Sequence, residues 1–291
     1  MKLDLDPGKY VLAISGGVDS AVLLDLCSKL DDGYEFVVAH FDHGIRENSS
    51  RDQFFVAELA KKYQFGYVYG EGKLGLKTSE EKARVARYNF LRKVLADTDS
   101  KAIITAHHQD DVLETMIMNL MRGTGRKGLS SLDTTSEIVR PLLNAAKHDI
   151  KMYAEKNNLE WVEDETNQDT KYKRNEIRIE IIPKLSKKQR DQLIELWFEA
   201  KNRNKAIDQL LDDIGSADAN LSRSILLSMS HKAASELVAT WLRNHHLRDF
   251  DKKAIERIVI GAKTLKAGSL IDVVKKAKVK VTKSTLQFLD K

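Results

Sequence analysis

Short apolar runs alternate with longer amphipathic segments through the first half of the chain. The apolar runs predict buried strands at 9–14, 36–40, 66–69 and 101–106. The amphipathic segments predict helices at about 22–30, 53–63, 79–97 and 110–121, with Ser79 as the N-cap of the third. Strands that alternate with helices favour a parallel sheet covered on both faces. We therefore predict a doubly wound parallel α/β domain.

The pattern becomes helical near Pro183, one of only three prolines in the chain. One amphipathic pattern runs from 187 to about 214, two further helices are predicted at 221–242 and 250–263, and 269–289 partly alternates as a strand does. Because proline interrupts regular structure, we place a boundary there. The predicted organisation is an α/β domain over 1–185, a helical linker over 186–218 and a smaller, mainly helical C-terminal domain over 219–291.

The composition narrows the class of protein. The chain has 291 residues, of which 42% are hydrophobic and 31% charged, as in ordinary folded domains. No apolar stretch approaches the ~20 residues of a membrane span, and the N-terminus lacks the apolar core of a secretory signal. A single cysteine, Cys27, excludes an internal disulfide and a Cys-rich metal site, and its place on the first helix predicts a buried apolar side chain. We expect a cytoplasmic, two-domain protein with no membrane segment.

The charges are unevenly distributed along the chain. Residues 184–291 contain 22 Lys+Arg and 13 Asp+Glu, a net of +9, whereas residues 1–183 have a net of −4. Between Lys263 and Lys283 there are seven lysines and one acid, and Lys276, Lys278 and Lys280 lie in the alternating part. A basic half can bind a polyanion such as RNA, although solvated surface lysines explain the same counts.

The loop between the first strand and the first helix is the most informative stretch; it reads Ser15-Gly16-Gly17-Val18-Asp19-Ser20. Its glycines allow close approach to a ligand, and the helix that follows presents free N–H groups to a phosphate. Asp19 could hold a Mg²⁺ that shields the phosphates. The loop matches neither the Walker nor the dinucleotide pattern. Simple capping by Ser and Asp is the alternative, but the position directly after an apolar strand favours an anion site.

Two further stretches place polar groups near this loop. His40 and His43 follow the second strand with a carboxylate between them, which could suggest a metal site, but no third ligand is nearby. A polar loop at the strand end explains them equally well. On the helix 79–97, Arg84 and Arg87 are three residues apart, so both can reach one anion. An ordinary surface ion pair between Glu80 and Arg84 is the alternative.

The segment after the fourth strand carries paired histidines and carboxylates. Asp111 and Glu114 lie at i and i+3 on one helical face, so both can point at a cation. Helix capping accounts for Asp110, and it can account for Asp111 as well. Further basic positions follow at Arg122, Arg126 and Lys127 in a glycine-rich loop and at Arg174 and Arg178 in a polar segment. Taken alone, the last two are best explained as an exposed charged face.

These stretches together resemble one enzyme family. The 15–20 loop resembles the pyrophosphate loop of the PP-loop ATPases, an adenine nucleotide alpha hydrolase-like superfamily. The segments beginning at 40, 83, 106, 122, 140, 164 and 174 are similar, in order, to motifs of its tRNA(Ile)-lysidine synthetases. Asp42 and Ile45 replace the Asn and Leu of the first of these motifs. The resemblance covers 15–183 and does not extend into the C-terminal half, as expected for a short form.

The resemblance implies an ATP-dependent ligation of free L-lysine to C2 of the wobble cytidine of a tRNA(Ile) with a CAU anticodon. The intermediate is an adenylated cytidine, and the products are lysidine, AMP and pyrophosphate. It implies ATP contacts at 15–20, His40 and Arg84, and a Mg²⁺ on Asp19. Asp19, Asp111 and Glu114 would be catalytic, the last two holding the substrate lysine. The expected tRNA contacts are Arg122, Arg126, Lys127, Arg174, Arg178, Lys276, Lys278 and Lys280.

Two other functions compete with this interpretation. One is a different PP-loop enzyme that adenylates a small molecule or another tRNA base. Sulfur-transferring relatives need cysteine pairs, and Cys27 stands alone. The other is a basic RNA-binding protein whose α/β domain is only structural. The first would incorporate no lysine, and the second would show no chemistry between ATP and pyrophosphate.

Overall fold

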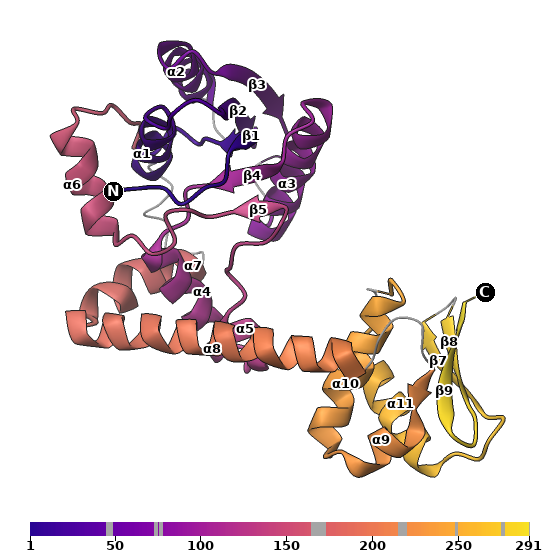
Figure 1. Ribbon diagram of the computed structural model, residues 1–291. Helices are drawn as coiled ribbons and strands as arrows, with labels where there is room; N and C mark the ends of the chain where they lie inside the picture. Colours follow the sequence, from indigo (N-terminus) through magenta and orange to yellow (C-terminus); the bar gives the residue numbers. More distant parts are fainter. Residues whose placement is uncertain are drawn as a thin grey trace. The chain divides into compact units, whose positions relative to one another are not determined.

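The computed structural model describes residues 1–44, 49–72, 75, 78–163, 173–214, 220–247, 250–274 and 277–290 (Figure 1). The chain divides into two compact units, unit 1 (Met1–Ala200) and unit 2 (Lys201–Lys291). Each unit has its own hydrophobic core. Within the described ranges, no helix combines the length and the apolar character that a membrane crossing requires.

Unit 1 is built on a parallel sheet with the strand order β3-β2-β1-β4-β5. In register, Leu12 of β1 lies beside Val38 of β2 and Ile104 of β4. Because β1 is central and its neighbours lie on both sides, the chain reverses its direction of winding there. The strands are β1 (Gly8–Ala13), β2 (Tyr34–Asp42), β3 (Gly66–Glu71), β4 (Ala102–Thr105) and β5 (Ile138–Val139).

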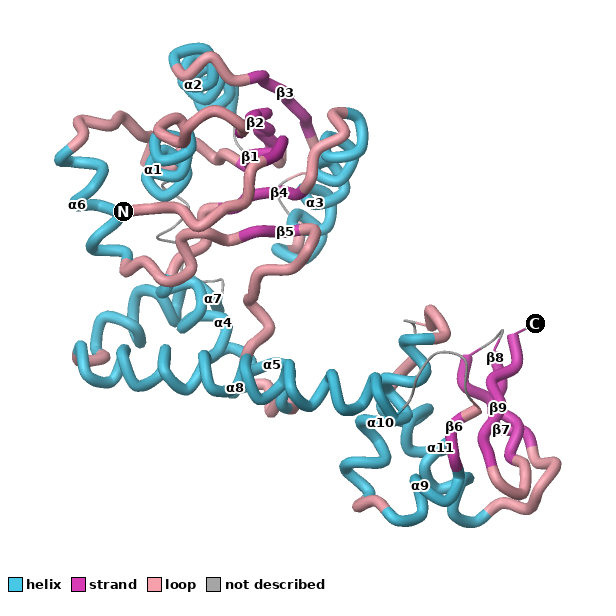
Figure 2. The backbone as a smooth tube through the Cα atoms, in the orientation of Figure 1, coloured by secondary structure: helices cyan, strands magenta, loops and turns pink. Residues whose placement is uncertain are grey.

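Helices cover both faces of this sheet (Figures 1 and 2). One face is covered by α1 (Val18–Cys27), α2 (Ser49–Lys62) and α6 (Lys147–Lys156), whose apolar residues share a core with Leu12, Val38 and Ile104. The other face, which includes Val11 and Ile103, packs against α3 (Glu80–Asp97). Alternate residues of each strand thus point to opposite layers, as the continuous apolar runs require.

The doubly wound α/β fold predicted from the sequence is confirmed. Ser79 caps α3, as predicted, by accepting a hydrogen bond from Lys82 N. Cys27 is buried, and its surroundings raise the pKa of its thiol through burial. Of the sheet and the helices that cover it, two elements were not predicted, β5 and α6. β5 is only two residues long, and α6 buries only Ile150 and Ala154, so neither leaves a clear period in the sequence.

The remaining helices of unit 1 lie below the sheet in Figure 1. α4 follows β4, and α7 continues into a π-helical turn and then a 3₁₀ turn that contains Pro183. π-helical turns inside helices often occur at functional sites. These elements are α4 (Gln109–Met121), α5 (Arg126–Leu129), α7 (Lys173–Glu176), the π turn Ile177–Ile181, the 3₁₀ turn Ile182–Lys184 and the first half of α8 (Lys187–Ile214).

Unit 2 combines helices with an antiparallel sheet of strand order β6-β9-β8-β7. Its core contains Trp241, Leu237, Ile258 and Val279. Its elements are β6 (Leu221–Ser222), α9 (Arg223–Ser228), α10 (His231–Asn244), α11 (Lys252–Thr264), β7 (Leu270–Val274), β8 (Ala277–Val281) and β9 (Thr285–Asp290).

The prediction of a mainly helical C-terminal region is confirmed, with the small antiparallel sheet added to it. The helix at 187–214 is confirmed as α8. The single helix predicted for 221–242 is wrong, because the chain forms a short strand and two helices there. Ser222 and Ser230 each cap a new helix by accepting a hydrogen bond from the backbone N–H three residues later. These two N-caps start separate helices, although the apolar spacing runs through the whole segment without a break.

Candidate active site

The polar groups of unit 1 gather at the carboxyl ends of two neighbouring strands. The loop 15–20 follows β1, and His107 and His108 follow β4, which pairs with β1. The winding of the chain reverses at this point, and α/β sheets bind their ligands at such positions. The loop and the paired histidines, although about 90 residues apart in sequence, therefore open onto one site.

The loop 15–20 has the backbone shape that an anion site needs. Gly16 adopts a φ of +95°, a conformation that favours glycine. The Oγ of Ser20 accepts a hydrogen bond from Gly16 N at 3.1 Å and donates to Gly17 O at 2.8 Å. Gly17 caps α1 without a side chain, so the N–H groups of the first helical turn remain available to a ligand.

Asp19, in the first turn of α1, is held by a lysine from a distant part of the chain. Lys147 Nζ donates to both carboxylate oxygens of Asp19, at 2.5 and 2.7 Å. His108 Nε2 lies 3.6 Å from Asp19 Oδ2. Burial disfavours the charged carboxylate, but the contacts with His108 and Lys147 outweigh it and lower the pKa of Asp19. Asp19 is therefore ionised at neutral pH.

His108 connects the loop to the start of α4. It is the N-cap of α4, and its Nδ1 accepts a hydrogen bond from Asp110 N at 3.2 Å. Its own backbone N donates to Asp111 Oδ2 at 2.9 Å, which completes a capping box. The Nε2 of His108 lies 3.5 Å from Asp111 Oδ2, so this ring stands between Asp19 and Asp111. Asp111 therefore does cap its helix, and it has other partners as well.

The carboxylate of Glu114 is fully buried and binds two arginines from the helical segment 173–181. Arg174 Nε donates to one oxygen at 2.7 Å, and Arg178 Nε donates to the other at 2.6 Å. Arg174 Nη2 also donates to Asp111 at 3.1 Å. Glu114 has no exposed side-chain surface, and Arg174 is 20% exposed. The interpretation of Arg174 and Arg178 as an exposed charged face is therefore wrong.

A cavity of about 320 Å³ opens beside this cluster, lined by arginines of α3 and of the 173–181 segment together with α4. Burial raises the pKa of Asp111, but His108, His107 and Arg174 outweigh it and bring it to about 2. Burial and the surrounding arginines lower the pKa of His107 to about 3, so its ring is neutral at pH 7. Six residues of the lining carry this chemistry: Arg84, Arg87, His107, Asp111, Arg174 and Arg178.

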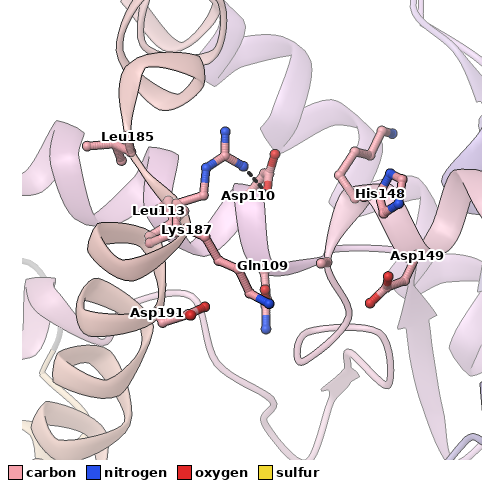
Figure 3. Close-up of a pocket in the computed structure, with 11 residues that line it drawn as sticks. Gln109, Asp110, Leu113, His148, Asp149, Leu185, Lys187 and Asp191 are labelled. Atoms are coloured by element: carbon pink, nitrogen blue, oxygen red, sulfur yellow. Dashed lines mark ion pairs between the residues drawn. The ribbon is translucent and has the colours of Figure 1, made fainter.

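A second cavity, of about 510 Å³, lies between the starts of α4, α6 and α8. Figure 3 shows His148 and Asp149 on one side and Lys187 and Asp191 on the other, with Asp110 between them. Arg190 pairs with Asp110 at 3.8 Å. This mixture of acidic and basic groups favours neither a polyanion nor a bare metal ion.

Residues 2–185 match the family model described as the PP-loop domain. This match covers more than half of the chain, and it contains the loop 15–20 and the whole lining of the 320 Å³ cavity. The chain belongs to the PP-loop family. The model ends close to Pro183, where the sequence pattern becomes helical.

Curated relatives of this PP-loop protein include tRNA(Ile)-lysidine synthases. The enzyme of Thermotoga maritima is 40% identical over 189 residues, which cover 62% of this chain and 46% of that protein. The enzyme of Histophilus somni (strain 2336) is 31% identical over 258 residues, covering 82% and 60%. The chain thus spans about half the length of the curated relatives it matches.

Among solved structures, the U34-tRNA thiolase NcsA from Methanococcus maripaludis aligns with a TM-score of 0.46 and 15% identity, over 84% of this chain and 75% of that chain. A likeness of this size adds nothing to the functional argument.

The PP-loop fold brings together several residues that the sequence pattern left apart. Arg84, Arg174 and Arg178 share one cavity with Asp111. His40 is buried at the end of β2, where its Nδ1 lies 2.8 Å from Ile14 O, so it braces the strand that leads into the loop. Lys147, which holds Asp19, was not among the predicted site residues. Its only sequence signal is its place six residues after Pro141, at the start of α6.

Other predicted residues lie elsewhere in the PP-loop protein. Arg122 caps the far end of α4, roughly 20 Å along the helix from Gln109, and Arg126 and Lys127 begin α5. In unit 2, Lys278 and Lys280 lie on the face of β8 opposite its buried residues, and Lys278 pairs with Asp272 at 3.1 Å. Lys276 and residues 164–172 lie outside the described residues.

The side chains around Asp19 decide whether this residue could hold a Mg²⁺. Within the described ranges, no group of three His, Cys, Asp or Glu side chains could enclose a metal ion. Both oxygens of Asp19 are bound by Lys147. The residues therefore do not form a metal site by themselves. They fit only an ion that binds one carboxylate and takes its other ligands from phosphates, as Mg²⁺ often does.

Proposed function

We propose that this PP-loop protein attaches free L-lysine to the wobble cytidine of a tRNA(Ile) in an ATP-dependent reaction, as a tRNA(Ile)-lysidine synthase. One observation carries the proposal. The chain of contacts from Asp19 through His108 and Asp111 to Arg174 joins the phosphate loop to a cavity of suitable size for an amino acid. The names of the curated relatives support the same activity.

The first step needs a phosphate site next to a base pocket. The N–H groups at the start of α1 and the hydroxyls of Ser15 and Ser20 would hold the ATP phosphates. The O2 of cytosine attacks the α-phosphorus, a bond between O2 and phosphorus forms, and the bond to pyrophosphate breaks. Lys147 lies where it can exchange Asp19 for a phosphate oxygen and thus offset the charge of the leaving group. An anticodon base is single-stranded and can enter such a pocket.

The second step needs a lysine held beside the activated base. The ε-amine attacks C2, the bond between C2 and O2 breaks, AMP leaves with that oxygen, and the amine loses a proton. Free lysine carries two ammonium groups and one carboxylate at pH 7, and the pKa of its ε-ammonium is about 10.4. The cavity offers both signs of charge, an ionised Asp111 and several arginines. These are complementary to a free amino acid.

Asp111 and Glu114 receive different roles in this proposal. Asp111 lines the cavity, so it would contact a substrate ammonium. Glu114 is fully buried and both of its oxygens are bound, so it would act by holding Arg174 and Arg178 in position. Arg174 and Arg178 would then face the substrate in the cavity and not a distant part of the RNA.

The RNA contacts would come from basic groups outside the cavity. Arg122 and Lys127 are exposed beside α5, and Lys280 is exposed on β8. Such groups bind phosphates without reading the base sequence. We propose that tRNA(Ile) contacts both units through these residues, with the wobble cytidine at the phosphate loop.

The proposed activity is tested by incorporation of radiolabelled lysine into bulk tRNA, with and without ATP. We expect label in tRNA only when ATP is present, together with release of AMP and pyrophosphate in equal amounts. ATP-dependent pyrophosphate release without lysine incorporation would indicate another PP-loop adenylating enzyme. No reaction between ATP and pyrophosphate would indicate a binding protein with a structural α/β domain.

A further inference from the structure

Helices α1 and α6 lie side by side in unit 1 and are joined by two separate polar contacts (Figure 1). At the phosphate loop, Asp19 binds Lys147. Farther along, Asp25 accepts a hydrogen bond from Tyr153 Oη at 2.8 Å. The two members of each pair are 128 residues apart in the sequence, so the second pair lies six residues, roughly 9 Å of helical rise, beyond the first on both helices. The helices therefore run in the same direction and in register.

Asp25 is a buried carboxylate in an otherwise apolar stretch of helix. Its side chain is 9% exposed, and the other residues of 21–27 are buried and apolar. Besides Tyr153, Lys29 Nζ donates to this carboxylate at 2.7 Å and Tyr63 Oη donates at 3.1 Å. Burial disfavours the charge, but the hydrogen bonds from Lys29, Tyr153 and Tyr63 outweigh it and lower the pKa of Asp25. Asp25 is therefore ionised at neutral pH.

Stability alone does not explain a carboxylate at this position. Replacing a buried ion pair with apolar side chains of similar volume is often neutral or even stabilising. A hydrogen bond differs from apolar packing because it is directional, and the best-attested use of a buried polar group between helices is to fix their register. The contact between Asp25 and Tyr153 thus specifies how far α6 is advanced along α1.

The register of α6 matters for the chemistry because Lys147 is its first residue. In the proposed first step, Lys147 exchanges Asp19 for a phosphate oxygen, so the contact at the loop no longer holds α6. The contact between Asp25 and Tyr153 remains, because neither residue lines either of the two cavities. A displacement of about 1 Å at a catalytic group can lower a rate by about 100-fold.

We propose that Asp25 and Tyr153 are positioning residues for adenylation: they fix the register of α6 on α1 and thereby hold the ammonium of Lys147 at the phosphates. This inference rests on the proposed function, and specifically on its ATP-dependent first step. It does not depend on which nucleophile completes the second step.

The test measures pyrophosphate release at saturating ATP and tRNA in the absence of lysine, which reports the first step alone. Tyr153→Phe removes only a hydroxyl group. We expect its rate constant to fall about 10- to 100-fold, because Lys147 is no longer held in place. The tRNA concentration that gives half of the maximal rate should not change, since the hydroxyl lies outside both cavities.

The matched control is Tyr63→Phe. Tyr63 directly follows α2 and donates to the same carboxylate, but it does not connect α1 to α6. Both variants lose a hydrogen bond to Asp25, so both should unfold at a lower urea concentration than the wild type. Only Tyr153→Phe should slow pyrophosphate release.

A double-mutant cycle with Lys147→Ala separates positioning from general destabilisation. Lys147→Ala alone should lower the rate constant by about 100- to 1000-fold, as the loss of one charged group at a phosphate site commonly does. Because Tyr153 acts through Lys147, adding Tyr153→Phe to this variant should cause no further loss. Two independent effects would instead multiply.

Three results would each overturn the inference: an unchanged rate constant in Tyr153→Phe, an equal loss in Tyr63→Phe, or effects that multiply in the double variant. A wild type that releases pyrophosphate but incorporates no lysine would contradict the proposed function and leave the inference standing. A wild type that releases no pyrophosphate from ATP and tRNA would overturn both, so the failures are distinguishable.

Discussion

Unit 1 buries charges, and unit 2 buries almost none. The buried side chains of unit 1 include Asp111, Glu114, His108 and Arg140, gathered near the ends of its parallel strands. The core of unit 2 is apolar throughout, and its buried polar side chains among the described residues are Asn204 and Thr240. Both units fill their interiors, but among the described residues it is unit 1 that buries ionisable groups, which then require partners.

This difference indicates where the chemistry lies. A buried ion pair often adds little stability compared with an apolar replacement, so a cluster of them is better explained by function than by folding. The apolar core of unit 2 needs no such explanation, because burial of apolar surface alone stabilises it. We therefore expect substitutions that lower the free energy of unfolding by the same amount to impair catalysis when they lie in unit 1 and to reduce only stability when they lie in unit 2.

Glu114→Gln should give the largest change. It leaves Arg174 and Arg178 without their buried counter-ion and should cost unit 1 about 3 kcal/mol or more. The protection of β4 amides in hydrogen exchange should fall, the protection of β8 amides should not, and lysine incorporation should be lost.

The matched change in unit 2 is Leu237→Ala, which creates a cavity and should cost about 2–5 kcal/mol there. Pyrophosphate release should be unchanged at a temperature where both units are folded. If the two variants impaired catalysis equally, the division of roles between the units would be wrong.

Asp19→Ala should reduce ATP-dependent adenylation by about 100- to 1000-fold, as loss of one charged group at a phosphate site commonly does. The fold should persist, because Lys147, which loses its partner, is 31% exposed and can be solvated. The readouts are pyrophosphate release and circular dichroism. A folded variant with near-normal turnover would remove Asp19 from the phosphate site.

Asp111→Asn should separate the two steps of the proposed reaction. It keeps the shape of the side chain but deletes the charge that would face the substrate ammonium, so the lysine KM should rise about tenfold or more. Adenylated tRNA should still form. Should the first step slow while lysine saturation stays the same, Asp111 belongs to the nucleotide or RNA side of the site.

The stability of unit 1 should depend on pH through His107. Its pKa is about 3 in the folded protein, mainly through burial, and about 6.5 when unfolded. Below pH 6.5 the unfolded chain therefore binds a proton that the folded chain does not. As the pH is lowered from 6.5 towards 3, the free energy of unfolding falls by up to about 1.4 kcal/mol per pH unit. His107→Asn should reduce this slope between pH 7 and 5. In unit 2, burial and His246 also lower the pKa of His245, but it is less buried, and His245→Asn should alter the slope less.

Reversing the charges of Lys276, Lys278 and Lys280 should have the smallest effect. Binding of tRNA should weaken, and the slope of log K against log salt should decrease by about one unit or slightly less for each lost phosphate contact. ATP affinity should not change. The control reverses Lys61, Lys62 and Lys93 in unit 1. An unchanged slope in the unit 2 variant would show that the tRNA is bound elsewhere.

The local features of this protein could be predicted from its sequence. The apolar periods gave the strands β1–β4 and the long helix α8, because each is specified by residues close together in the chain. The glycines and serines of 15–20 indicated the phosphate loop for the same reason. β5 and α6 were missed because contacts with distant parts of the chain, and not a local apolar period, stabilise them.

The pairing of charges was decided by the tertiary structure. Glu114 meets Arg174 and Arg178 across 60 and 64 residues, and Asp19 meets Lys147 across 128. The sequence shows that these side chains are ionisable, but it does not show whether each one is exposed to solvent or paired with another charge. Only packing removes the water and places opposite charges within reach, and the free-energy cost of burying a charge alone then selects the partner. The sequence by itself therefore determined the loop 15–20 and the α/β fold of unit 1, and the long-range packing decided which charges line the cavity.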